Sequence, residues 1–536
     1  MNLLSIAFVL FFLAAAAVYF LFPVKKYQWT VLLAASYAFY AFAGPKYLGY
    51  MAFTTLSSYL LTLWMGRVQS RAKQTLAENK ESWDKERKKR FKAQVALRTR
   101  WLMLTALLLN FGVLFVLKYL PTTLAAASGI FGFTTPGWRL VLPLGISFYT
   151  FQTMGYVIDV YRGEVAVEKN LGKLALFVSF FPQLLQGPIS RYDQLASQLY
   201  EPHRFEFKRL QYGLELILWG LFKKLVIANR AAIAIQTVTA APDSFAGGTL
   251  AFTVVLYALQ VYADFSAGID IARAVAQILG IDMIQNFRQP YFARSLTEYW
   301  NRWHISLGAW MKTYVFYPIA LSKRANRFTR AVKASRFGNT KVGAHIAVVL
   351  PGTLASLIVF LLVGIWHGAG WRYIIYGLWN GGVIMTSILL KPCFEALNRL
   401  LHIDTTKPEH YLFQILRTFL LVCVGNLTDL VQSGREFFHW LRRIFTETQF
   451  FTSVAEVSKK IGLGQREYFL LLVCTLLLYF VGVIRERHPQ TPLRELMDRR
   501  PYLTRFFVIV GGVAFLLIFG VYGPGVGANE FAYMEF

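Results

Sequence analysis

The sequence has few cysteines and few charged residues for its length. Only 3 of its 536 residues are cysteine, and 16% are charged against 56% that are hydrophobic. A soluble protein carries about a quarter charged residues, and a small secreted disulfide scaffold needs many more cysteines. The composition therefore excludes a soluble enzyme, a disordered chain and a disulfide-rich domain, and it indicates a polytopic helical membrane protein.

Several catalytic and cofactor motifs are also missing. The sequence contains no HExxH, no Cys/His cluster, no GxSxG, no P-loop and no GxGxxG. A zinc protease, a serine hydrolase and a nucleotide-binding enzyme therefore lack support. Cys393, Cys423 and Cys474 lie far apart in apolar sequence. We interpret them as small buried hydrophobic residues, and we expect no metal site.

Acidic residues are about half as frequent as basic ones, 29 against 56. Residues 67–100 hold twelve Lys or Arg with four acids, and residues 321–345 hold seven with none. These blocks lie between apolar runs, as the positive-inside rule expects of cytoplasmic loops, so no nucleic-acid partner is expected. The first apolar run, 3–22, has no basic residue before it, which indicates a retained first helix with its N-terminus outside.

The apolar runs predict an all-α fold with about eleven to fourteen helical spans, together with re-entrant and interfacial helices. We expect a membrane core over residues 1–400, which includes the basic cytoplasmic hairpin 67–100, and an additional C-terminal helical region over 401–536. Within that region, residues 435–445 place Phe437, Phe438, Leu441 and Phe445 on one face. This pattern is typical of an interfacial amphipathic helix.

Two polar segments interrupt the hydrophobic sequence, and each is a functional candidate because polar groups at membrane depth are costly. In FPQLLQGPISRY (181–192), two prolines prevent an unbroken helix. The segment predicts a re-entrant loop that lines a cavity, and a loop at the membrane surface is the alternative. In YADFSAGIDIA (262–272), Asp264 and Asp270 follow an apolar run. They could bind a cation, orient an acceptor, or simply cap a helix start.

A third segment, WNRWHISLGAWM (300–311), surrounds a histidine with tryptophans. At helical spacing Trp300, His304, Leu307 and Met311 share one face. Such an aromatic stripe is often core or interfacial belt, but the histidine within it makes a functional role a competing interpretation.

The fourth segment, GIWHGAGW (364–371), places His367 between two long apolar runs. Its neighbouring glycines allow close approach of a ligand or another helix. The alternative is a structural histidine bonded to a carbonyl. Without a metal, the natural role of a buried histidine is general base, because burial disfavours the cation. His367 could activate a hydroxyl against a thioester, with Asn301, Arg302 or His304 as donors to the oxyanion.

At these residues the sequence resembles the membrane-bound O-acyltransferase family, and most of all its bacterial branch of alginate O-acetylases and teichoic-acid D-alanyl transfer proteins. The resemblance rests on the segments above and on the terminal EFAYMEF (530–536). It implies that His367 is the catalytic histidine and His304 the second functional one. It also implies a reaction tunnel lined by substrate-binding residues, for which the candidates are Gln183, Gln186, Arg191, Asp264, Asp270, Asn301, Arg302, Trp303 and Trp366.

The resemblance implies a bacterial inner-membrane enzyme with no tightly bound cofactor. Its donor would be a cytoplasmic thioester, acetyl-CoA or an acyl carrier protein. Its acceptor would be a hydroxyl of an extracytoplasmic polysaccharide or cell-wall polymer, with a periplasmic or extracellular transferase as a further partner. The chain length favours acetyl transfer over D-alanyl transfer. From a different class, a proton-coupled transporter or flippase that uses Asp264, Asp270 and the histidines is the alternative.

Overall fold

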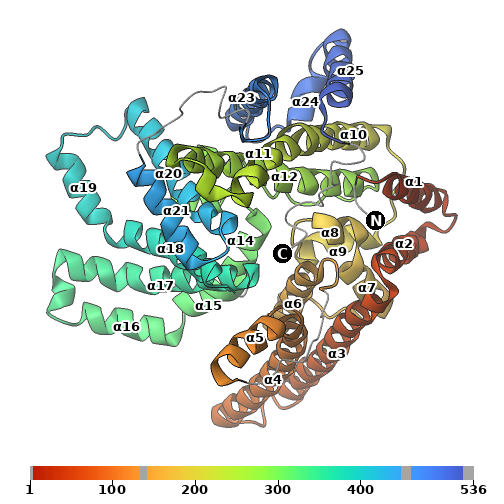
Figure 1. Cartoon of the computed structure of the whole chain (residues 1–536). Helices are drawn as coiled ribbons and strands as arrows, with labels where there is room; N and C mark the ends of the chain where they lie inside the picture. The colour runs from red at the N-terminus through yellow and green to blue at the C-terminus, as the bar shows by residue number, and fades with distance from the viewer. Residues whose placement is uncertain (1–3, 133–141, 369, 448–459, 523–536) are drawn as a thin grey trace. The chain divides into compact units, whose positions relative to one another are not determined.

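The computed structural model describes residues 4–132, 142–368, 370–447 and 460–522, and every regular element in these ranges is helical (Figure 1). The predicted all-α fold is thus confirmed. The chain forms two compact units: unit 1 comprises residues 1–213 and 272–284, and unit 2 comprises residues 214–271 and 285–536. The predicted division at residue 400 stays a prediction, and the terminal motif 530–536 lies outside the described residues.

The regular elements described in unit 1 are helices. In chain order they are α1 (Ile6–Leu21), α2 (Gln28–Ala43), α3 (Leu48–Glu78), α4 (Lys85–Lys118), α5 (Leu120–Phe131), α6 (Ile146–Arg162), α7 (Leu171–Ser179), α8 (Phe181–Gln186), α9 (Tyr192–Tyr200) and the first half of α10 (Phe207–Leu221).

Unit 2 starts within α10 and continues through a π-helical turn, Phe222–Ala228. Its further helices are α11 (Asn229–Ala240), α12 (Gly247–Ile278, up to residue 271), α13 (Leu296–Trp300), α14 (Ile305–Met311), α15 (Tyr317–Ala320), α16 (Lys323–Lys333), α17 (Lys341–His367), α18 (Trp371–Leu389), α19 (Lys391–Leu400), α20 (Pro408–Leu430), α21 (Gly434–Thr446), α23 (Gln465–Arg487), α24 (Leu493–Asp498) and α25 (Tyr502–Phe519).

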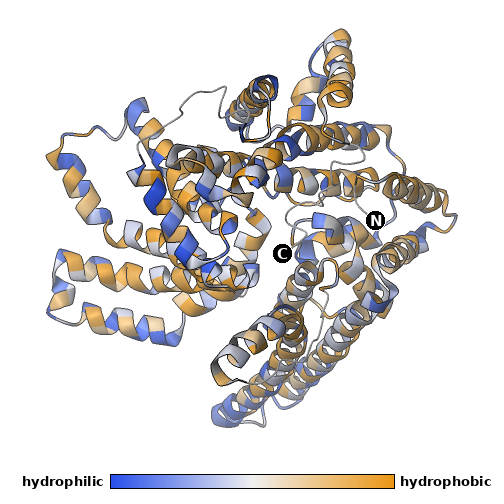
Figure 2. Ribbon diagram, in the orientation of Figure 1, coloured by the Kyte–Doolittle hydropathy of each residue, from blue (hydrophilic) through white to orange (hydrophobic). Residues whose placement is uncertain are grey.

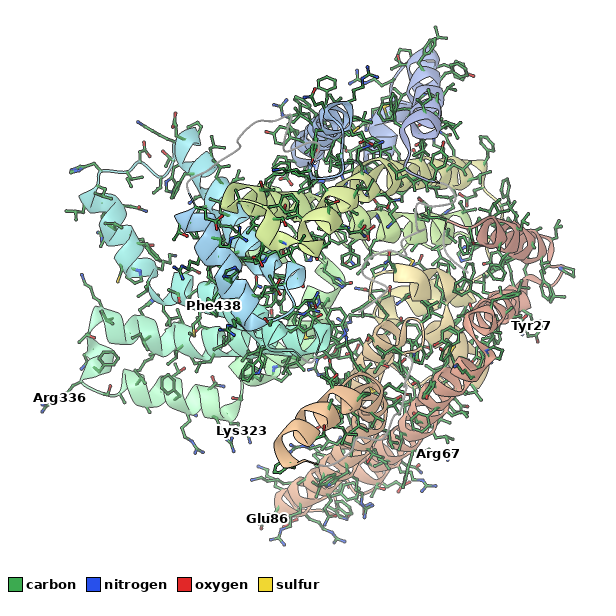
Figure 3. All side chains as sticks on the ribbon, viewed as in Figure 1. Tyr27, Arg67, Glu86, Lys323, Arg336 and Phe438 are labelled. Atoms are coloured by element: carbon green, nitrogen blue, oxygen red, sulfur yellow. The ribbon has the colours of Figure 1, made fainter. Side chains whose placement is uncertain are left out.

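The hairpin of α3 and α4 is longer than a bilayer is thick. With 34 residues, α4 spans about 51 Å, against about 30 Å of hydrocarbon. Trp64 and Trp101, which are 59% and 62% exposed, lie at similar distances from the turn, as expected of residues at a membrane–water interface. The basic segment between the two tryptophans contains the exposed Arg67 and Glu86 (Figure 3). The ends of α3 and α4 that meet at the turn are hydrophilic (Figure 2). This part of the hairpin would therefore extend beyond the hydrocarbon layer.

Six of the described helices are long and apolar enough to cross a membrane: α4, α12, α17, α20, α23 and α25. The bent pair of α18 and α19 raises this number to seven if it forms one span. This count is lower than the predicted eleven to fourteen. Several predicted spans are helices of 16 or 17 residues, such as α1, α2 and α6, and others are broken into short pieces. A multi-pass membrane protein is nevertheless confirmed.

The predicted break near residues 181–192 is present. Helix α8 ends at Gln186, and Gly187 and Pro188 lead through extended backbone to α9. Proline removes a backbone donor and disfavours helical geometry in the preceding residue, which explains the interruption. Most of this segment is buried, so its irregular backbone lies against protein, as the bilayer requires.

An apolar core of unit 2 lies among the π-helical turn, α11, α12, α20, α21 and α23. Phe437 and Trp440 of α21 are buried in it, whereas Phe438 (Figure 3) and Phe445 of the same helix are exposed. The predicted amphipathic helix is therefore present, but its phenylalanines do not share one environment. Cys423 and Cys474 are buried as expected, whereas Cys393 is exposed, which corrects the expectation for that residue.

Candidate functional site

The first histidine, His367, is the last residue of α17, and α18 begins four residues later at Trp371. Its side chain lies in an aromatic surround with 9% of the residue exposed. The ring centroid is 4.9 Å from that of Trp366, 5.3 Å from Tyr376 and 6.3 Å from Tyr373, whose ring is nearly parallel to it. The imidazole therefore has three aromatic rings as neighbours.

Glycines allow α17 and α18 to approach closely around this histidine. A Cβ atom on Gly364 would lie 2.2 Å from the carbonyl oxygen of Tyr373, and one on Gly368 would lie 2.1 Å from its ring. A Cβ on Gly377 would lie 2.7 Å from the carbonyl oxygen of Phe360. The predicted role in helix approach is confirmed for Gly364 and Gly368, because a side chain at either position would separate the helices and move Tyr373 away from His367. It does not hold for Gly370, where a Cβ atom would lie no closer than 3.8 Å to its neighbours.

The second histidine, His304, lies between α13 and α14 in a left-handed backbone conformation with φ of 45°. The prediction of one helical face from Trp300 to Met311 is therefore wrong: the helix ends at Trp300 and restarts at Ile305. The cause is pairing with Asn286, whose carbonyl oxygen accepts from the amide of Ile305 at 3.0 Å. Left-handed geometry is costly outside glycine, so these contacts must hold the residue in place.

The contacts of Asn286 also assign the proton on His304. The Oδ1 atom of Asn286 accepts from the amide of Ser306 at 2.8 Å, so its Nδ2 group faces the imidazole Nδ1 atom at 3.2 Å. Because that amide nitrogen only donates, Nδ1 is the acceptor and the proton of the neutral ring lies on Nε2. His304, which is 1% exposed, is thus arranged as a hydrogen-bond donor.

Trp366 links the two histidines, which are far apart in the sequence. Its ring centroid is 6.4 Å from that of His304 and 4.9 Å from that of His367. A second connection runs from Trp300, which donates to Asn380 at 3.2 Å. Asn380 in turn donates to the carbonyl oxygen of Tyr376, the neighbour of His367. Unit 2 therefore assembles His304, Trp366 and His367 into one aromatic cluster.

The residues before His304 differ in their surroundings. Asn301 is exposed. The guanidinium of Arg302 forms ion pairs with Glu298 at 2.8 Å and with Glu486 of α23 at 2.5 Å. Trp303 is buried and stacks on Tyr299 with a centroid distance of 5.7 Å. Arg302 and Trp303 thus hold the chain that leads to His304.

Asp264 and Asp270 lie in the interior of α12 and form ion pairs with consecutive lysines. Lys224 donates to Asp264 at 2.5 Å, and Lys223 donates to Asp270 at 2.8 Å and to Ser266 at 2.8 Å. Capping of a helix start does not apply, because α12 starts at Gly247. Each carboxylate faces a lysine ammonium, which neutralises the charge that a bound cation would need.

Gln183, Gln186 and Arg191 belong to unit 1, whereas both histidines belong to unit 2. Gln183 donates to Gln152. Gln186 is 1% exposed, and neither polar atom of its amide has a hydrogen-bond partner among the described residues. Arg191 forms ion pairs with three carboxylates, with distances of 3.3 Å to Asp159, 3.5 Å to Glu164 and 3.4 Å to Asp193.

The chain is similar to one protein-family model and to several known proteins. The family model of the membrane-bound O-acyltransferases matches residues 168–334. The probable alginate O-acetylase AlgI of Azotobacter vinelandii is 31% identical over 423 residues, which cover 76% of this chain and 70% of the relative. The chain belongs to the membrane-bound O-acyltransferase family.

Two further known proteins are similar to this chain. The peptidoglycan O-acetyltransferase of Helicobacter pylori is 28% identical over 67% of this chain and 64% of its own length. The teichoic acid D-alanyltransferase of Bacillus subtilis is 27% identical over 57% of this chain and 72% of its own length. The predicted family is confirmed, and the protein is an acyltransferase rather than the transporter or flippase considered above.

Three further residues, Lys223, Lys224 and Asn286, contact predicted site residues of this acyltransferase. Lys223 and Lys224 interrupt an otherwise apolar stretch, and that interruption is a signal that could have indicated partners for Asp264 and Asp270. Asn286 lies in a polar connection and carries no comparable local signal. Its importance depends on contacts with residues 304–306, which only the fold reveals.

Proposed function

We propose that this acyltransferase moves an acetyl group from a cytoplasmic thioester to a hydroxyl of an extracytoplasmic polysaccharide or cell-wall polymer. The observation that carries the proposal is the cluster of His304, Trp366 and His367, in which one imidazole is arranged as a donor. The relatives named for alginate and peptidoglycan acetylation support the acetyl group and the polymer acceptor.

In the proposed reaction His367 acts as general base. It removes the proton of the acceptor hydroxyl as the oxygen attacks the thioester carbonyl carbon. The Nε2–H group of His304 donates to the oxyanion that forms. The carbon–sulfur bond then breaks, the proton passes from His367 to the departing thiolate, and the products are an ester and a free thiol. The chemistry needs no tightly bound cofactor; acetyl-CoA and an acyl carrier protein are the two candidate donors.

The other predicted residues take supporting roles in this proposal. Gln186 has buried amide groups that a substrate could satisfy, which favours a substrate contact. Asn301 and Trp366 are the remaining candidates for substrate contact. Arg302, Trp303, Asp264 and Asp270 hold the site, and Gln183 and Arg191 hold the segment around Gln186. A periplasmic or extracellular transferase that receives the acyl group remains a proposed partner.

The acyl group and the acceptor can be tested together. Surface polymers from cells with and without the gene are hydrolysed under mild base, and the released acids are measured. We expect acetate that depends on the gene. Gene-dependent release of D-alanine would instead support the alternative, D-alanyl transfer to teichoic acid, which the Bacillus subtilis relative suggests over a smaller share of the chain. Release of neither acid would contradict both.

We also propose that the protein lies in the bacterial inner membrane with its N-terminus outside. In a Cys393→Ser background, where Cys423 and Cys474 are buried, we expect Lys80→Cys to react with an impermeant maleimide only after the inner membrane is permeabilised. Lys46→Cys should react in intact spheroplasts, because it follows the second apolar run. The reverse labelling pattern would contradict this orientation.

A further inference from the structure

Unit 1 contains a surface cavity of about 490 Å³ that the acyl-transfer proposal does not use. It lies where α2 begins, where α7 begins and where α9 ends, and Lys26, Trp29, Lys173 and Tyr200 contribute to its lining. The described residues that line it include two lysines and no acidic residue. The cavity is therefore suited to an anion.

Both lysines are held beside aromatic rings. The Nζ atom of Lys173 lies 4.8 Å from the ring centroid of Tyr200, and the Tyr200 hydroxyl donates to the Lys173 carbonyl oxygen at 2.8 Å. The Nζ atom of Lys26 lies 5.8 Å from the ring centroid of Tyr27 (Figure 3). These contacts restrict two flexible side chains, which lowers the entropy cost of binding an anion between them.

Two exposed apolar side chains, Leu21 and Phe205, lie within five residues of the lining residues Lys26 and Pro202 in the sequence, and we call them the apolar border. Leu21 at the end of α1 is 81% exposed, and Phe205 is 55% exposed with its ring 5.6 Å from that of Phe20. The chain around residue 205 is tied to the start of α2 because Gln28 exchanges hydrogen bonds with the backbone of His203 at 2.8 Å and 3.0 Å. A cationic cleft that is lined by Tyr27 and Trp29, in segments that also expose Leu21 and Phe205, is typical of a membrane interface.

We propose that this cavity binds the phosphate of an anionic glycerophospholipid, whose acyl chains lie along the exposed apolar border. Lys26 and Lys173 pair with the phosphate, and the N-termini of α2 and α7 add a favourable positive potential. A soluble phosphate compound would use the same lysines but would gain nothing from Leu21 and Phe205. The apolar border therefore favours the lipid.

Native mass spectrometry of the full chain in detergent, with phosphatidylglycerol as the probe, tests this proposal. We expect Lys26→Ala with Lys173→Ala to weaken retention of the lipid about tenfold, because two charge-assisted contacts are lost. The control is Lys46→Ala with Lys208→Ala, which removes two exposed lysines that also lie over tyrosine rings but do not line the cavity. That variant should retain the lipid as the wild type does.

Further arms separate the lipid from other sources of phosphate. Inorganic phosphate and glycerol phosphate at the same concentration should not displace the lipid; displacement by either would overturn the proposal in favour of a soluble ligand. Lys26→Arg with Lys173→Arg should keep the lipid, which makes the test independent of the folding of the alanine variant. Equal retention by the wild type and the alanine variant, or loss of lipid from the arginine variant, would overturn the proposal.

Discussion

Replacement of His367 with glutamine is expected to lower the rate of acyl transfer about a thousandfold. Glutamine has a similar size and can donate a hydrogen bond, but it cannot accept the proton of the acceptor hydroxyl at neutral pH. The ring lies at the end of α17 among Trp366, Tyr373 and Tyr376, and an amide can occupy that space without a large change in volume. The measurement is transfer of labelled acetyl to polymer in membranes that contain equal amounts of folded protein.

A matched control lies on the same helix. His345 of α17 is half-buried, and its Nε2 atom lies 3.1 Å from the carbonyl oxygen of Ile388. Glutamine can keep this hydrogen bond, so His345→Gln should retain the transfer rate to within about fivefold, since less than ~1 kcal/mol is at stake. A His367→Gln enzyme that keeps a tenth or more of the activity would contradict the role of His367 as general base.

The sequence predicted the parts of the candidate site that depend on local pattern. Gly364, Gly368 and His367 lie within a few residues of one another, and their spacing alone indicates a close helix crossing next to a histidine. The break before Pro188 follows from the chemistry of proline and likewise needs no tertiary information. Near His367 and at Pro188, the structure that the local sequence favours is therefore the structure that the fold has.

The geometry at His304 could not be predicted in the same way. The aromatic spacing of residues 300–311 matches a helical period, yet the helix is interrupted because Asn286 pairs with the backbone of residues 305 and 306. Those residues are distant in sequence from Asn286, so a local pattern cannot predict the hydrogen bonds that interrupt the helix. Lys223 and Lys224 differ, because two charges in an apolar stretch are a local signal of buried partners, and only the identity of those partners, Asp264 and Asp270, depends on the fold.

Breaking the ion pair between Lys224 and Asp264 is expected to have the largest effect on stability. Both side chains are almost fully buried and 2.5 Å apart. Lys224→Gln or Asp264→Asn alone leaves an uncompensated charge in the interior, which costs about 3–5 kcal/mol. We expect a clear fall in the thermal denaturation midpoint of the detergent-solubilised protein for each single variant.

The combined Lys224→Gln and Asp264→Asn variant should recover most of the lost stability, because two neutral amides leave no unpaired charge and can bond to each other. The exposed pair of Arg90 and Glu86, 3.2 Å apart, is the control. Arg90→Gln should change the free energy of unfolding by less than ~1 kcal/mol. A combined variant as unstable as the sum of the single variants would show that the two side chains act independently.

The same variants connect the ion pair to the chemistry. Asp264 directly precedes Phe265, whose ring centroid is 5.0 Å from that of His304. A shift of α12 at Asp264 would therefore move the aromatic wall behind the proposed donor, and a displacement of about 1 Å at such a position can cost a hundredfold in rate. We expect the single variants to lose acyl transfer at temperatures where they remain folded, with kcat lowered more than substrate affinity. If kcat stays at the wild-type value in the folded single variants, the ion pair contributes to stability alone and the position of His304 depends on Asn286.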